Sequence, residues 1–373
     1  MKYQKLCGTE QALKVFENER HTWSALNKYV EENKVDCDLW TGETYNVAMS
    51  PQVAELAHEV FLSYQTAGGK TDHITVMRDP VTAEKMSRIN GAQSCYAWQA
   101  STLQPRKLTG HLMREAISKG ANLQTHTTVT SVSAAGPGQQ KRDARWIVHT
   151  SRGNIACRDV VHASNAYLPA YLPLFRNLVQ PVPYTCSKVV PPRSFSGLKA
   201  LRNSYGVLLR DGSLISINPR STSDGAIMFG GDNVGQQALD KWMLEHPEEC
   251  TNDGFANLPA VAVAVEEFTT NHFQGWTATP RGVGEGFDYS WSGIIGRTLD
   301  GVPMVGEIPG MKGQWICAGH CGHGMARIFT AGPGLVKLMN DETWETTGLP
   351  EVYRLDEQRL QKLQRESGEA SAK

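Results

Sequence analysis

The segment of residues 313–339, GQWICAGHCGHGMARIFTAGPGLVKLM, constrains the fold of this chain more than any other. Its apolar start favours a buried strand, Gly319, Gly322 and Gly324 favour a turn, and the remainder has a helical pattern. A helix that begins after such a turn presents unpaired backbone N–H groups and partial positive charge. The segment therefore suits the anionic or electron-rich edge of a ligand, which glycines allow to approach the main chain. Ordinary strand-to-helix connections contain similar glycines, so the pattern alone leaves both interpretations open.

Length and composition favour a globular protein that handles a small molecule. The chain has 373 residues, 40% of them hydrophobic, which suggests two domains or one large α/β body with a second lobe. The formal net charge is −1 with both signs interspersed, so neither nucleic acid nor an anionic membrane is an expected partner. No apolar run approaches the roughly 20 residues that cross a bilayer, and no signal-peptide pattern occurs, so we expect a cytoplasmic protein. The oligomeric state does not follow from the sequence.

The eight cysteines are scattered along a chain without a secretion signal, which favours free thiols over disulfides. One dense group is formed by Cys317, His320, Cys321 and His323. Its C-x3-C and H-x2-H spacings interleave and match no common zinc pattern. We therefore expect no metal site.

Periodicity and capping signals predict helices along much of the chain. Apolar residues recur at helical spacing over residues 9–32 and predict an amphipathic helix. Ser50 followed by Pro51 predicts a helix that stops at residues 68–69, and Asp79 followed by Pro80 predicts another over residues 81–89. Further helices are expected over residues 105–119, 236–245 and 260–272, and a frayed polar tail after residue 340.

Alternating and apolar runs predict strands in the remaining segments. Residues 38–48 are interpreted as two short strands. The other predicted strands cover residues 127–134, 145–151, 160–164, 205–209, 213–217 and 226–231, with a turn at residues 152–154. The pattern indicates an alternating α/β architecture.

Four sequence blocks, in the same order, resemble the D-amino-acid oxidase/sarcosine oxidase (DAO) family of FAD-dependent oxidoreductases. The loop GHCGHGM at residues 319–325 is similar to the family's C-terminal flavin-contacting loop, and SWSGIIGRTLDGVPMVGEIPG at residues 290–310 to the strand and turn before it. IACRDVVHASNAYLPAYLP at residues 155–173 is similar to the strand that ends under the FAD. Residues 101–132 resemble the helix and strand that reach the adenine. The resemblance extends over about residues 8–339.

The resemblance implies an α/β (α+β) fold with a Rossmann-like FAD-binding domain and an antiparallel-sheet substrate domain. It assigns residues 1–35, 91–175 and 290–345 to the FAD-binding-like domain, 36–90 and 176–289 to the substrate domain, and 346–373 to a polar tail. It also implies a three-stranded meander between residues 129 and 165.

The family's first βαβ segment, with its G-x-G-x-x-G turn, has no counterpart in the sequence. We therefore expect a truncated FAD-binding domain. Three explanations remain open: Met1 is not the true start of the protein, FAD binds weakly, or FAD has been lost while the fold was kept.

Roles for individual residues also follow from the resemblance. The backbone of Gly322, His323, Gly324 and Met325 is expected to contact the flavin and to stabilise its negative charge. Replacing Gly324 with a β-branched residue such as valine is expected to do more harm than replacing any single cysteine. The other expected FAD contacts are Val129, Ser164, Asn165, Ala166, Trp291 and Gly293. The Trp-Ser-Gly segment contains no cysteine, so the expected binding is noncovalent.

His323, Arg327 and Arg281 are the expected catalytic residues, with the arginines, and also Arg220, as candidates for holding a substrate carboxylate. The oxygen-activating lysine of related oxidases would lie on the strand AIMFGGDN, which contains no lysine here.

The implied function is oxidation of a C–H bond next to an amine or related group of a small molecule, in secondary metabolism, with FAD as cofactor. Two alternatives remain open. One is a cofactor-independent isomerase or cyclase that uses side chains such as His323, Tyr289 or Asp288, and the other is a noncatalytic relic of the fold.

Overall fold

The computed structural model describes residues 2–136, 143–276 and 282–371. The chain forms two compact units, each assembled from segments that are far apart in the sequence. Unit 1 contains residues 29–112 and 183–293, and unit 2 contains residues 2–28, 113–182 and 294–373. Residues 91–112 thus belong with unit 1, whereas the sequence-based division grouped them with residues 113–175.

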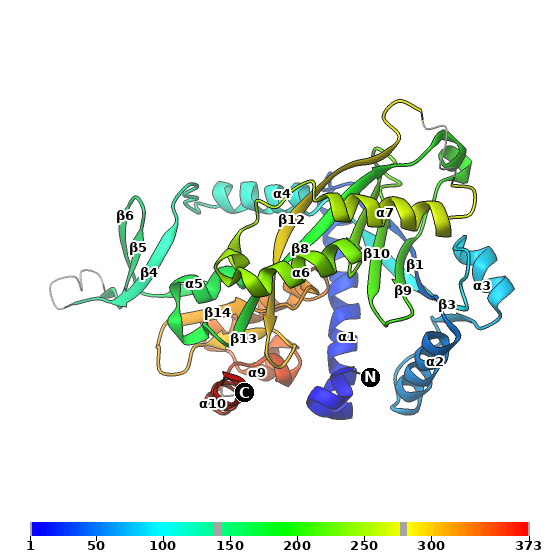
Figure 1. The fold of residues 1–373 in the computed structure, drawn as a ribbon. Helices are drawn as coiled ribbons and strands as arrows, with labels where there is room; N and C mark the ends of the chain where they lie inside the picture. Colours follow the sequence, from blue (N-terminus) through cyan, green and yellow to red (C-terminus); the bar gives the residue numbers. More distant parts are fainter. Residues whose placement is uncertain (1, 137–142, 277–281, 372–373) are drawn as a thin grey trace. The chain divides into compact units, whose positions relative to one another are not determined.

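Unit 1 is built on a mainly antiparallel sheet with the strand order β12-β8-β11-β10-β9-β1-β3-β2 (Figure 1). Only one of its described pairings, β1 with β9, is parallel. The first residues of β8 and the last residues of β12 belong to unit 2. The strands are β1 (Trp40–Ala48), β2 (Thr75–Met77), β3 (Ser94–Thr102), β8 (Val179–Val190), β9 (Ser204–Leu208), β10 (Leu214–Pro219), β11 (Ile227–Gly231) and β12 (Gly286–Thr298).

Helices α6 and α7 lie side by side over this sheet (Figure 1). Helix α7 inserts Val261, Val265 and Phe268 into a core that also holds Phe229 of β11. The helices that lie in unit 1 are α2 (Pro51–Thr66), α3 (Pro80–Ser87), α6 (Val234–Glu245), α7 (Pro259–His272) and most residues of α4 (Pro105–Ser118).

The predicted helix starts are confirmed. The Ser50 hydroxyl accepts a hydrogen bond from the Val53 N–H at 3.3 Å, and the Asp79 carboxylate accepts one from the Thr82 N–H at 2.9 Å. These contacts satisfy donors that a helix N-terminus otherwise leaves unpaired. The prediction of two strands over residues 38–48 is wrong, because β1 is continuous and pairs with β3 on one side and β9 on the other.

Unit 2 contains a sheet with the order β13-β14-β7, in which β13 is antiparallel and β7 parallel to β14. A separate meander, β4-β5-β6, uses residues 153–157 as its third strand, where only a turn was predicted for residues 152–154 (Figure 1). The predicted strand at residues 160–164 joins β14 as β7. The strands are β4 (Val129–Ala134), β5 (Trp146–Thr150), β6 (Gly153–Cys157), β7 (Val160–His162), β13 (Met304–Glu307) and β14 (Gln314–Ala318).

Helix α1 (Lys2–Glu32) is interrupted at Gly8, whose φ of 79° and ψ of 167° are not helical. The regular helix therefore begins at residue 9, as the apolar periodicity predicts. The other helices of unit 2 are α5 (Leu168–Tyr171), α8 (Ile328–Met339), α9 (Trp344–Thr347) and α10 (Glu357–Ser371). In the two units together, short 3-10 turns occur at Asn165–Tyr167, Pro173–Phe175, Arg193–Phe195, Gly197–Lys199, Pro247–Thr251, Gly324–Ala326 and Glu351–Tyr353.

The C-terminal segment is folded, which corrects the expectation of a frayed polar tail. Leu355, Leu360 and Leu363 are buried in one hydrophobic cluster, and Trp344 and Tyr353 in another. Few apolar residues occur in this segment, but they fall on the faces that pack against the unit. The charged composition that suggested disorder belongs to the exposed faces of α10.

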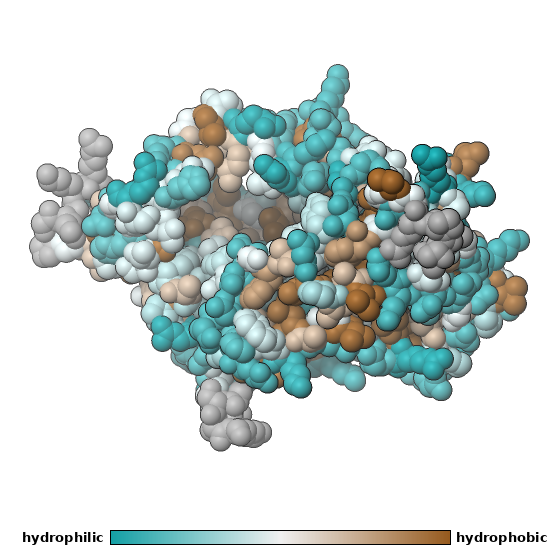
Figure 2. Space-filling model, turned by 45° about the horizontal axis from the view of Figure 1, so that its top comes forward, coloured by the Kyte–Doolittle hydropathy of each residue, from teal (hydrophilic) through white to brown (hydrophobic). Residues whose placement is uncertain are grey.

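Hydrophilic side chains cover most of the face shown in Figure 2, and hydrophobic residues gather there in separate groups. Among the helices that the structure describes, none combines the length and apolar character needed to span a membrane.

Replacing Leu363 with alanine tests the packing of α10. The side chain is 0% exposed, so we expect a loss of roughly 2–5 kcal/mol in the free energy of unfolding. Exposed Gln364 is the matched control, and its replacement with alanine should change stability by less than about 0.5 kcal/mol. Denaturant unfolding of both variants decides the question, and equal midpoints would mean that α10 does not pack as described.

Candidate functional site

The predicted strand, glycine-rich turn and helix at residues 313–339 are confirmed. Strand β14 ends at Ala318, a 3-10 turn covers Gly324–Ala326, and α8 begins at Ile328. Between them, Gly319, Cys321 and Gly322 have positive φ angles of 73°, 54° and 81°. The loop of residues 319–325 therefore turns sharply, by using backbone conformations that favour glycine.

Side chains and carbonyls of unit 2 hold one part of this loop. The Asn165 Oδ1 atom accepts hydrogen bonds from the N–H groups of Gly319, at 2.9 Å, and His320, at 3.2 Å. Cys321 N–H donates to the Gly296 carbonyl at 3.0 Å, and His323 N–H donates to the His320 carbonyl at 2.9 Å. Asn165, expected to contact the cofactor, thus uses its side chain to support the loop.

Other amides of the loop remain available. Within the described part of the chain, the N–H groups of Gly322, Gly324 and Met325 have no hydrogen-bond partner. The sequence-based interpretation expected His323 to belong to this set, but its amide closes a turn inside the loop. Met325 is 47% exposed and Ile328 is 50% exposed, so apolar surface accompanies the three donors.

Within the loop, Gly319 has less steric freedom than Gly324. A Cβ atom on Gly319 would lie 2.3 Å from Thr298 Cγ2, and its φ of 73° is left-handed. Gly324 has no positive φ, and a Cβ there would lie 3.0 Å from the flexible end of Ile328. Gly296 also packs closely, since its Cβ would lie 3.0 Å from Ala166 N. The structure thereby brings Asn165 and Ala166 next to the loop.

Arg327 does not lie where a substrate could reach it. Its side chain is 0% exposed, and Nη2 lies 2.8 Å from Glu19 Oε1. The guanidinium also donates to the His320 carbonyl at 3.3 Å and to the Tyr3 hydroxyl. This position does not fit the expected role in holding a substrate carboxylate, because every direction of the guanidinium is enclosed.

The other two arginine candidates have different outcomes. Arg281 lies outside the described residues. Arg220 is within 3.3 Å of both Asp38 and Asp224, so two carboxylates already compensate its charge. That arrangement does not favour binding of a third carboxylate.

The two histidines of the loop have opposite environments. His323, the expected functional histidine, has a side chain 57% exposed, with Nδ1 4.0 Å from Glu19 Oε1. His320 is only 4% exposed, and its Nδ1 atom has no partner among the described residues. Burial, together with the nearby positive charge of Arg327, lowers the pKa of His320 to about 4. His320 is therefore neutral at physiological pH.

Ser164, a further expected cofactor contact, ends a chain of buried and partly buried hydrogen bonds. Its hydroxyl lies 2.8 Å from the Tyr171 hydroxyl, which lies 3.1 Å from His162 Nδ1. His162 Nε2 lies 2.7 Å from Gln314 Oε1 on β14. Burial lowers the pKa of His162, although its bond to Gln314 acts in the opposite direction.

The remaining expected contacts are distributed over both units. Val129 begins β4 in unit 2, where it is half-buried. Trp291 and Gly293 lie on β12 in unit 1, where Trp291 is 37% exposed and the space at the Gly293 Cβ position is open.

The sequence interpretation missed a lysine on the strand next to β11. Strand β11 itself contains no lysine, as expected. Lys188 on β8 is the cross-strand partner of Met228 on β11, so their side chains share a face. Lys188 Nζ lies 3.1 Å from Asp288 and 3.7 Å from Asp224, and the bond to Asp288 raises the pKa of the lysine. Lys188 also lies against the exposed ring of Tyr289, whose centroid is 5.7 Å from Nζ.

All eight cysteines are free. Cys317 Sγ and His320 Nε2 are 3.7 Å apart. Nowhere in residues 2–136, 143–276 and 282–371 do three or more His, Cys, Asp or Glu side chains gather as they would around a metal ion.

Alanine substitution separates the roles of the two loop glycines. Gly319→Ala should lower the free energy of unfolding by roughly 2–5 kcal/mol, because it adds a left-handed strain and a clash with Thr298. Gly324→Ala should have a much smaller effect, because only the end of Ile328 needs to move. Thermal or urea unfolding measures both, and a larger loss for Gly324→Ala would contradict the loop geometry.

The buried His320 should make stability depend on pH. The unfolded chain binds a proton near the ordinary pKa of 6.5, while the folded chain does so only near the lowered value of about 4. Stability is therefore expected to fall as the pH decreases from 6.5 to 4, by about 3 kcal/mol in total from this group. His320→Gln should show a shallower decline over that range. Parallel slopes for the two proteins in urea unfolding at several pH values would refute the assignment.

Comparison with known proteins identifies the family. Residues 5–338 match the DAO family, whose description is FAD dependent oxidoreductase. The "Probable oxidoreductase OrdL" of Rhizobium meliloti (strain 1021) is 20% identical over 328 residues, which cover 86% of this chain and 66% of that protein. The chain thus spans just under two thirds of the length of this relative. The family match begins at residue 5 and does not bear out the expected N-terminal truncation, which stays a prediction.

Solved structures agree on the fold. Glycine oxidase from Geobacillus kaustophilus has a TM-score of 0.65 and 18% identity, with coverage of 92% of this chain and 82% of that chain. Iminodiacetate oxidase (IdaA) from Chelativorans sp. BNC1 has a TM-score of 0.59 and 13% identity, with coverage of 88% and 81%. The expected mixed α/β fold is confirmed, and the matches indicate an enzyme. The chain belongs to the DAO family of FAD-dependent oxidoreductases.

Proposed function

We propose that this chain binds FAD noncovalently and oxidises a C–H bond next to an amine or related group of a small molecule. Membership of the family supports the cofactor and the reaction class. Two structural neighbours are a glycine oxidase and an iminodiacetate oxidase, and in both named compounds a nitrogen is attached to an oxidisable CH₂ group. A role in secondary metabolism is part of the same proposal.

The observation that carries the proposal is the set of free amides in the loop. The N–H groups of Gly322, Gly324 and Met325 fit the electron-rich edge of a flavin, because they provide donors without a competing protein acceptor among the described residues. When bound, FAD would supply the two-electron oxidant. The amides and the following turn would stabilise negative charge at the bound edge.

The nucleotide half of FAD finds less support in this chain. The sequence has no G-x-G-x-x-G turn, and the described residues contain no strand, glycine-rich turn and helix with that spacing. We therefore propose weak binding, in which the flavin half contributes most of the affinity. Ser164 and Val129 are the proposed contacts for the remainder of the cofactor.

His323 is the proposed catalytic side chain, because it is exposed and belongs to the same loop as the free amides. Arg327 is proposed as a support of that loop. Lys188, paired with Asp288 and close to Asp224, is proposed as a lysine of unit 1 for oxygen chemistry.

Flavin titration with a matched pair of glycine variants tests the proposal. Gly324→Val places two methyl groups beside the free amides, so FAD affinity should fall by about tenfold or more. Gly332→Val is the control, since Gly332 lies on α8 with open space at its Cβ position. Flavin fluorescence gives the affinities, and the thermal midpoints show whether both variants remain folded.

The same titration distinguishes the proposal from its alternatives. Riboflavin should bind nearly as well as FAD, whereas ADP should compete poorly, because the proposed contacts are to the flavin half. Equal FAD affinity in the two variants would exclude the loop as the flavin contact. No saturable binding of either flavin by the wild-type protein would favour the cofactor-independent enzyme or the relic.

A further inference from the structure

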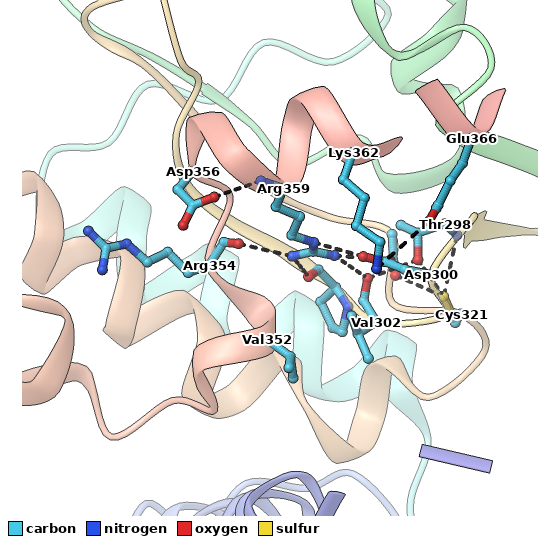
Figure 3. A network of polar contacts seen from close by, with 12 residues as sticks. Thr298, Asp300, Val302, Cys321, Val352, Arg354, Asp356, Arg359, Lys362 and Glu366 are labelled. Atoms are coloured by element: carbon cyan, nitrogen blue, oxygen red, sulfur yellow. Dashed lines mark hydrogen bonds and ion pairs between the residues drawn. The ribbon is translucent and has the colours of Figure 1, made fainter. Parts of the chain in front are cut away.

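Arg359 of α10 lies at the centre of a network of polar contacts (Figure 3). Its Nε and Nη2 atoms donate to the two carboxylate oxygens of Asp300, at 2.8 and 3.1 Å. Nη1 donates to the carbonyls of Pro303, at 2.8 Å, and Arg354, at 3.2 Å, and Nη2 donates to the Val302 carbonyl at 3.0 Å. A guanidinium has five N–H donors, and all five have acceptors here.

This network is largely shielded from water. The side chain of Arg359 is 12% exposed and that of Asp300 is 20% exposed. The contact is bidentate, which fixes orientation as well as distance. Removal of the guanidinium would leave the Asp300 carboxylate and the Pro303 and Arg354 carbonyls without these donors, at a cost well above that of a surface ion pair.

Thr298 connects this turn to the glycine-rich loop. Its hydroxyl donates to the Val302 carbonyl at 2.8 Å, so one carbonyl accepts from both Thr298 and Arg359. On its other side, Thr298 contacts Cys321, whose Sγ lies 3.3 Å from the hydroxyl oxygen and accepts the Thr298 N–H at 3.4 Å. Figure 3 shows Arg359, Val302, Thr298 and Cys321 along this line.

Thr298 also determines the space that the loop can occupy. Its Cγ2 atom lies where a Cβ of Gly319 would be, at 2.3 Å. The Cys321 thiol in turn donates to the Gly319 carbonyl at 3.1 Å. Thr298 is therefore in contact with both left-handed residues that precede the free amides, and a shift of Thr298 would move them together.

We propose that Arg359 is a positioning residue for the loop of residues 319–325. Through the Val302 carbonyl and Thr298, it fixes the backbone geometry that presents the amides of Gly322, Gly324 and Met325. The consequence for flavin binding rests on the proposed function above, whereas the coupling between α10 and the loop does not.

The reactivity of Cys321 reports on this coupling without any cofactor. We expect Arg359→Gln to increase the alkylation rate of Cys321 by iodoacetamide about tenfold, because a loosened loop opens more often. Peptide mass spectrometry resolves Cys321 from the other cysteines. Lys362→Gln is the matched control on the same helix, since Lys362 is 58% exposed and pairs with Glu366 at 3.8 Å, and the Cys321 rate in this variant should equal that of the wild type.

A second pair of variants separates positioning from general stability. Thr298→Val keeps the shape of the side chain but removes the hydroxyl, and it should raise the Cys321 rate by a similar factor. The double variant with Arg359→Gln should then be no faster than the faster single variant, since both act through one connection. Arg359→Lys keeps the charge but not the planar fork, so it should restore only part of the protection.

The Cys321 alkylation rates are measured well below the thermal midpoint of each variant, so that global unfolding does not contribute to them. A lowered midpoint with an unchanged Cys321 rate would reduce Arg359 to a purely structural role. Multiplicative rates in the double variant would show that Thr298 and Arg359 act independently. If Arg359→Gln does not fold, Thr298→Val and Arg359→Lys still decide the question. FAD titration of the same variants is read separately, so absence of flavin binding would refute the proposed function and leave the coupling intact.

Discussion

The interior of unit 2 depends on a guanidinium that has no contact with water. The side chain of Arg327 is 0% exposed and pairs with Glu19 of α1. The rings of Tyr3 and Tyr353 lie at 5.5 and 5.8 Å from its guanidinium carbon. A buried charge is tolerated only with a partner, and removal of one partner typically costs about 3–5 kcal/mol. Arg327 therefore fixes the start of α8 relative to α1, and with it the end of the glycine-rich loop.

From that fixed end, side chains under the loop determine which amides remain available. Asn165 takes the first two N–H groups, and Thr298 excludes any side chain at Gly319. Residues that the family resemblance assigned to cofactor or substrate, Asn165 and Arg327, thus support the main chain in this protein. The donors that remain, on Gly322, Gly324 and Met325, belong to the backbone and so do not depend on the identity of a side chain.

The sequence predicts those secondary-structure elements that depend on residues close together in the chain. The caps at Ser50 and Asp79 involve residues three positions apart, so the sequence states both partners. Residues 38–48 contain polar residues and a glycine that resemble a break, but pairing on both sides keeps β1 continuous. In α10, two leucines among many charges suffice for packing, and no composition average reveals which face they share.

The ion pairs that support the candidate site could not be predicted from the sequence, because their partners are far apart in the chain. The Glu19–Arg327 pair joins residues 308 positions apart, and the Arg359–Asp300 pair joins residues 59 positions apart. In the sequence, Glu19 and Asp300 look like any other acidic residue, because only the fold brings each of them to its arginine. The residue pattern predicted the strand, turn and helix of this segment, but it could not show which amides of the loop the protein itself uses.

The assembly of unit 2 from three separated stretches of chain has a consequence for synthesis on the ribosome. Tyr3, Ala12 and Val15 share a buried cluster with Trp344 and Tyr353. The apolar face of the nascent α1 must therefore stay without these partners until almost the whole chain has emerged. Unit 1 has its complete set of residues earlier, at Gly293. Such contacts between distant residues slow folding, and the apolar surface of α1 is open to aggregation until they form.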